Sequence, residues 1–138
     1  MTWDAFHRRD EVLRAVIEEL NARRDGTLPL DLPGVAETFD ELSLVGALQL
    51  RWHTRLAGTI ERELMDHPSD HESAVVCAWS RVAQELAGVR AVLDAYTEAP
   101  TSEAMAAALG TARRKERALL ASMAGRASVQ EVRRAALT

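Results

Sequence analysis

Apolar residues recur along this chain at the three- and four-residue intervals of an α-helix. The clearest run lies between residues 75 and 96, where intervals of four and three alternate: Val75, Trp79, Val82, Leu86, Val89, Leu93 and Tyr96. This spacing is typical of helices that pack side by side in an antiparallel bundle. Gly88 falls inside the repeat without shifting it, so we expect one helix through this region with at most a kink.

Capping signals divide the chain into helices. Ser or Thr followed three residues later by Glu forms a capping box at Thr38, Ser69 and Ser128, and Gly26 and Gly125 can close helices. The predicted helices span residues 3–24, 39–66, 70–98, 102–124 and 129–137. We therefore expect a single all-α domain over residues 1–138, an up-down-up-down four-helix bundle with a long first loop and a short C-terminal helix.

The first loop, residues 25–37, is longer than a bundle turn requires, and it carries three leucines and a valine beside two prolines. We interpret it as an ordered crossover that covers one end of the bundle. A lid over a ligand pocket is the alternative.

Three ionisable residues fall on the apolar stripes. Asp10 projects close to the apolar face of the first helix, and Glu116 occupies the one missing step in the stripe of the last long helix. His53 falls between apolar residues of the second helix, with Gln49 one turn earlier. If the first two helices meet near residues 24 and 39, Asp10, His53 and Glu116 lie at one level of the bundle. Because an ionisable group is costly to bury alone, we expect these side chains to contact one another or a ligand.

Two chemistries fit such a layer. In the first, His53 bridges two carboxylates, Gln49 satisfies the remaining polar atoms, and the network fixes the order of the helices. In the second, His53, Glu116 and Asp10 bind a divalent metal or a small ligand. The sequence lacks the paired Glu-x-x-His elements of ferritin-like di-iron proteins, and we favour the structural network. A further pair, Glu63 and His67, is expected to form an exposed ion pair.

Charge is distributed unevenly along the chain, whose formal net charge is −4. Residues 1–100 carry 10 basic and 18 acidic side chains, whereas residues 101–138 carry 7 and 3. A basic surface is expected from Arg113, Arg114, Arg117, Arg126, Arg133 and Arg134. No aromatic residues interleave with these arginines, so we expect a solvated face or a contact to an acidic protein surface, and not nucleic-acid binding.

The sequence carries no Gly-rich phosphate loop, nucleophile elbow or Cys-x-x-Cys motif. It has no run of about eighteen apolar residues, and its first residues lack the features of a secretory signal, so we expect a cytoplasmic protein without a membrane segment. The predicted function is a non-enzymatic helical interaction or regulatory module that self-associates and needs no cofactor. The alternative is a metal- or ligand-binding bundle, such as an oxidoreductase, centred on His53 and Glu116.

Overall fold

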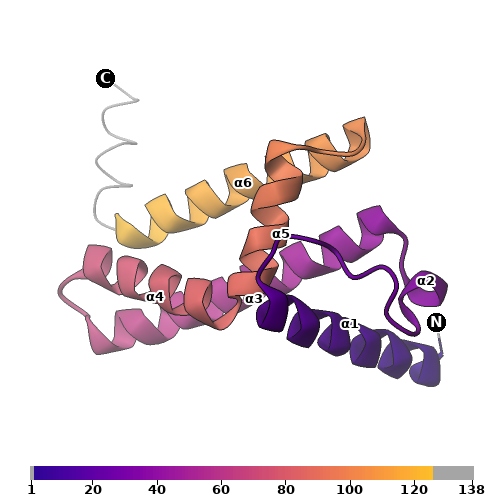
Figure 1. Ribbon diagram of the computed structural model, residues 1–138. Coiled ribbons are helices and arrows are strands. Elements are labelled where there is room, and N and C mark those ends of the chain that lie inside the picture. Colours follow the sequence, from indigo (N-terminus) through magenta and orange to yellow (C-terminus); the bar gives the residue numbers. More distant parts are fainter. Residues whose placement is uncertain (1, 126–138) are drawn as a thin grey trace.

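A computed structural model describes residues 2–125, and this part of the chain is helical without strands (Figure 1). In chain order the helices are α1 (Trp3–Arg23), α2 (Val35–Thr38), α3 (Glu41–Asp66), α4 (His71–Glu85), α5 (Ala87–Glu98) and α6 (Glu103–Ala124). The predicted all-α class is thus confirmed. The predicted helix over residues 129–137 lies outside the described residues.

Short polar side chains start the long helices, as capping chemistry requires. Asp40 and Ser43 form a reciprocal capping box at the start of α3, with the Ser43 N–H donating to Asp40 Oδ1 over 2.7 Å. Thr38, the predicted cap, instead ends α2 and donates its hydroxyl hydrogen to the Gly34 carbonyl. Asp70 caps α4 and Ser102 caps α6. The predicted starts of the three long helices after the first loop are therefore correct to within two residues.

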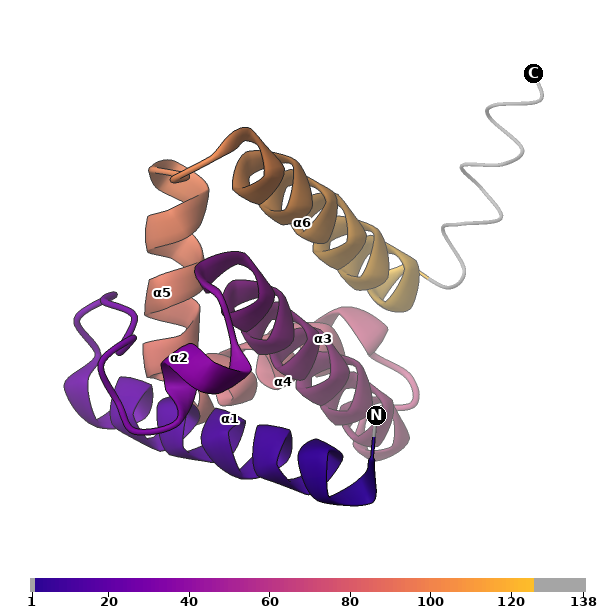
Figure 2. The same cartoon turned by 90° about the vertical axis from the view of Figure 1, so that its right-hand side faces the viewer.

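The chain after α1 turns back along α1 instead of entering a hairpin. Arg24 closes α1 in the left-handed conformation, at φ 55°, with its N–H donating to the Leu20 carbonyl. The connection then passes Val12, which lies 3.2 Å from the position of a Cβ on Gly34, and brings the Phe39 ring under the Arg9 guanidinium. Both α1 and α3 begin on the right in Figure 1, but in Figure 2 they run across one another, so the two helices cross and do not pair antiparallel. The predicted hairpin between the first two long helices is therefore wrong.

The predicted helix over residues 70–98 is two helices. The break falls at Leu86, and α5 leaves at a steep angle to α4 and packs on α1 (Figure 1). A Cβ on Gly88 would lie 1.8 Å from the Leu20 carbonyl oxygen, so the backbones of α1 and α5 touch at this glycine. The Gly88 N–H, freed by the break, donates to Asn21 Oδ1 over 3.0 Å. A side chain from α1 thus caps α5, which compensates for the interrupted helix.

The core lies between the α3–α4 hairpin, α5 and α6, with α1 closing the side opposite α6 (Figure 2). The stripe of residues 75–96 enters this core despite the break: Val75, Val82, Val89 and Leu93 are buried, and Trp79, Leu86 and Tyr96 are partly buried. On α3 the centre of the inward face is Trp52, which is fully buried. The inward face of α3 therefore differs from the predicted one at this level, because Trp52 holds the place that was expected for His53, which is half-buried.

Candidate functional site

Glu116 is buried in the core, as its place on the apolar stripe predicts, with 7% of its surface exposed. Its Oε1 accepts hydrogen bonds from Trp52 Nε1 at 2.5 Å and from an Arg90 terminal nitrogen at 2.7 Å. The Arg90 guanidinium also lies over the Trp52 and Trp79 rings, at 4.8 and 5.5 Å from their centroids. Glu116 is therefore satisfied by an arginine and an indole, and the predicted pairing with Asp10 and His53 is wrong.

Asp10 lies at the surface between α1 and α3, with 32% of its side chain exposed. It pairs with Arg14 at 2.8 Å and with Arg51 at 3.4 Å. Only the second half of α1 enters the core, through Leu13, Val16 and Leu20. The prediction that Asp10 is a core residue is wrong because the returning connection sets α1 at a different level from the hairpin that the prediction assumed.

Gln49 and His53 lie on the opposite flank of α3 and face α6. Both are half-buried and line a hollow together with Lys115. In the part of the chain that the structure describes, no group of three or more His, Cys, Asp or Glu side chains could hold a metal ion. The predicted ligands His53, Glu116 and Asp10 thus occupy three separate environments.

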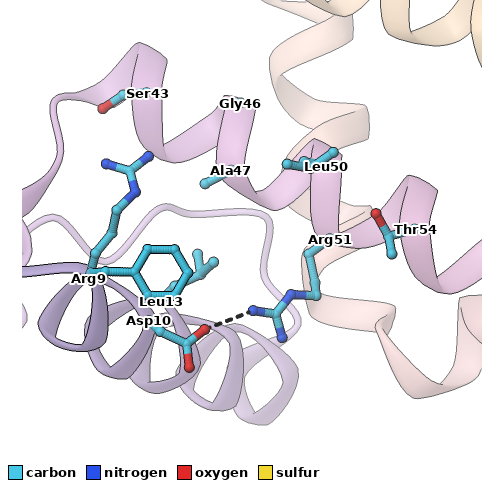
Figure 3. A pocket seen from close by; sticks show the side chains of 10 residues that line it. Arg9, Asp10, Leu13, Ser43, Gly46, Ala47, Leu50, Arg51 and Thr54 are labelled. Carbon is cyan, nitrogen blue, oxygen red and sulfur yellow. Dashed lines mark hydrogen bonds and ion pairs between the residues drawn. The ribbon is translucent and has the colours of Figure 1, made fainter. Parts of the chain in front are cut away.

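An apolar hollow lies between α1 and α3, where sequence reasoning placed no site. It has a volume of about 560 Å³ and an apolar floor that includes Leu13, Ala47 and Leu50. Figure 3 shows these residues between the two helices, with the Asp10–Arg51 ion pair joining α1 to α3. Phe6 also lines the hollow. We call this hollow the α1–α3 groove.

Exposed apolar side chains are concentrated on the same two helices. Trp3 is 74% exposed and Phe6 61% on the first turns of α1, while Leu50 is 66% and Leu42 40% exposed on α3. Phe6 and Trp3 thus lie outside the core, although both are large and apolar. A signal for this surface was present in the sequence, since Leu42, Gly46 and Leu50 recur every four residues on one side of α3.

The described part of the predicted basic surface is partly neutralised. Arg113 forms an ion pair with Asp94, and Arg114 donates a hydrogen bond to Thr111 Oγ1 at 3.1 Å. Arg117 is exposed. The other three residues of this prediction, Arg126, Arg133 and Arg134, lie outside the described residues.

Carboxylates also join α3 to α4. Glu63 was predicted to be exposed, yet only 6% of its side chain is, and it contacts Arg81 at 3.3 Å and His67 at 3.6 Å. Nearer the other end of the hairpin Arg55 Nε donates to Glu85 at 2.8 Å, and this hydrogen bond lowers the pKa of the Glu85 carboxyl. Glu63 and Glu85 are thus paired with residues of the same hairpin, and neither is free to bind a ligand.

Comparison of the chain with protein-family models, curated proteins and solved structures found no match. None of the described helices combines the length and the apolar composition that a membrane crossing needs.

Proposed function

We propose that this protein is a non-enzymatic interaction module that self-associates through the α1–α3 groove. One observation carries the proposal: the apolar hollow between α1 and α3 is lined by Phe6 and Leu50, two large apolar side chains that are exposed to water. Large apolar side chains that remain in water next to an unfilled apolar groove mark a surface that a partner covers. The predicted cytoplasmic location remains a prediction.

The preferred partner is a second copy of the chain. A two-fold interface uses the same patch on both copies, so the patch must carry both the projecting group and the hollow that receives it. Phe6 and Trp3 are exposed on α1, and Phe6 also lines the groove. If an aromatic ring of each copy filled the groove of the other, the ring and the groove would both leave water. Each large side chain that becomes fully buried would stabilise the dimer by about 1.5–3 kcal/mol.

The rim of the groove also suits a protein surface. Arg51 and Asp10 are paired across it, and Arg9 lies 4.4 Å from the Phe39 ring centroid. These charged groups surround an apolar centre, which is the usual arrangement of protein interfaces. The groove offers no group for catalysis, since the only carboxylate that lines it, Asp10, forms ion pairs with Arg14 and Arg51.

Sedimentation velocity tests the proposal. We expect the wild-type chain to sediment as a dimer at about 100 μM and to dissociate on dilution, as a standard-sized interface of moderate affinity does. Phe6→Glu should be monomeric throughout, because it places a charge in the apolar interface.

Val76→Glu is the matched control. Val76 is also 61% exposed and near the start of its helix, but it lies on α4, away from the groove. Its variant should dimerise like the wild type, and circular dichroism should show that both variants fold. A wild-type chain that is monomeric at every concentration, or an equal effect of the two substitutions, would overturn the proposal.

A further inference from the structure

A second, smaller hollow lies between α3 and α6, on the other side of Leu50 from the α1–α3 groove. Its volume is about 280 Å³. Gln49 and His53 line it from α3, one turn apart, and Thr111 and Lys115 line it from α6, also one turn apart. Two helices thus direct four polar side chains to one place.

Three of these four side chains have no partner within residues 2–125. Gln49, His53 and Lys115 make no hydrogen bond or ion pair there, whereas the preceding residues Arg113 and Arg114 on α6 each have a partner. Thr111 Oγ1 accepts a hydrogen bond from Arg114, which leaves its own hydroxyl hydrogen free to donate. The hollow therefore offers unused hydrogen-bond donors.

The charge of the hollow is positive in an acidic protein. No Asp or Glu lines it, and the one carboxylate nearby on α6, Glu116, is bound to Arg90 and Trp52. Lys115 is the only lysine in a chain that otherwise uses arginine at its basic positions. A lysine ammonium is a compact point charge that can donate to one anionic oxygen from several directions.

The remaining walls are apolar. Leu50, Ala108 and Ala112 face the hollow, so a ligand that fits must combine an anionic end with an apolar body. The volume equals that of about nine water molecules at about 30 Å³ each. A ligand of roughly ten non-hydrogen atoms would fill a space of this volume.

We propose that the α3–α6 hollow binds a small monocarboxylate with a short apolar body. The carboxylate would accept hydrogen bonds from Lys115, His53 and Gln49, while the body lies against Leu50 and Ala112. The single lysine cation matches a single negative charge, and a phosphate would bring more charge than the hollow can compensate. Because the hollow has hydrogen-bond donors and no carboxylate side chain, it suits an anion better than a metal ion.

Benzoate and benzamide are suitable probes, because they have nearly the same size and differ in charge. We expect benzoate to bind with a dissociation constant on the order of 1 mM, as for other ligands of this size. In a titration followed by backbone amide resonances, the shifts should be confined to α3 near His53 and α6 near Lys115. Benzamide should bind at least about tenfold more weakly, since it lacks the charged hydrogen bond.

Lys115→Met tests the assigned cation. It should weaken benzoate binding about tenfold, the usual effect of losing one hydrogen bond to a charged group. Arg117→Met is the matched control, because Arg117 is an exposed basic residue on the same helix that does not line the hollow. It should bind benzoate as the wild type does.

The same titration of Phe6→Glu separates this proposal from self-association, because Phe6 does not line the α3–α6 hollow. Undiminished benzoate binding by this variant is expected whether or not the wild type dimerises. Equal binding of benzoate and benzamide would overturn the carboxylate site. So would equal binding by Lys115→Met and the wild type, shifts centred on the α1–α3 groove, or no binding of benzoate at tens of millimolar.

Discussion

Gly88 offers the sharpest test of how α1 and α5 pack. Alanine is the better helix former, so propensity alone predicts that Gly88→Ala stabilises α5 by about 1 kcal/mol. The structure predicts the opposite sign, because the added Cβ would lie 1.8 Å from the Leu20 carbonyl oxygen and 2.5 Å from the Asn21 nitrogen. Both atoms belong to the backbone of α1 and cannot turn away as a flexible side chain would.

The magnitude follows from the displacement that this overlap forces. To restore an ordinary separation of about 3.5 Å, α5 must retreat from α1 by more than about 1.5 Å. That movement breaks the hydrogen bond from Gly88 N–H to Asn21 Oδ1, which costs about 1–3 kcal/mol, and it loosens the packing of the two helices by a similar amount. After the propensity gain is subtracted, we expect a net loss of about 2–4 kcal/mol.

Urea unfolding measures this difference, with Gly58→Ala as the control. Gly58 also lies inside a helix, but a Cβ there would meet no atom within 4 Å, so this variant should be more stable than the wild type by about 0.5–1 kcal/mol. The two identical substitutions should thus act in opposite directions. A Gly88→Ala protein at least as stable as the wild type would refute the close contact between α1 and α5.

Three further predictions concern polar groups. Glu116→Leu should lower the free energy of unfolding by about 3 kcal/mol, because it leaves Arg90 without its buried partner, and the double variant Arg90→Met/Glu116→Leu should lose less than the sum of the single changes in a double-mutant cycle. Arg24→Gly should raise the melting temperature, because the left-handed conformation at this position costs arginine about 1 kcal/mol and glycine almost nothing. Arg23→Gly should lower the melting temperature, because Arg23 is the last residue of α1 and glycine is a poor helix former. The hydrogen bond from the Ser43 N–H lowers the pKa of the Asp40 carboxyl, so the ionised cap stabilises the folded protein at a pH above the usual pKa of aspartate. This stabilisation is lost as the pH falls below about 4. Asp40→Asn should therefore make the free energy of unfolding, measured as a function of pH, less sensitive to acid.

Local patterns predict the helices because capping and periodicity act over a few residues. The stripe from Val75 to Tyr96 and the start of the last long helix near residue 102 are correct for this reason. The break at Leu86 could not be predicted, since it depends on the approach of α1, which lies more than sixty residues earlier in the chain. The direction of α3 relative to α1 depends on the path of the first connection, and neither apolar residues nor prolines specify that path.

The site residues show the same division. The burial of Glu116 follows from its place on the stripe, but Arg90, its charged partner, lies on another helix at a distance that no sequence pattern encodes. Gln49 and His53 share one side of α3, as their spacing requires. The place of His53 on α3 was predicted incorrectly, because Trp52 and His53 are adjacent and it is Trp52 that occupies the centre of the inward face.

The most direct test of the proposed function is an isotope-filtered nuclear Overhauser experiment on an equal mixture of labelled and unlabelled chains. The filter selects contacts between copies and removes those within one chain. We predict intermolecular contacts between the Phe6 ring of one copy and the Leu13 and Leu50 methyl groups of the other, in the α1–α3 groove. Intermolecular contacts that involve other surfaces, or none at a concentration of about 1 mM, would contradict self-association through this groove.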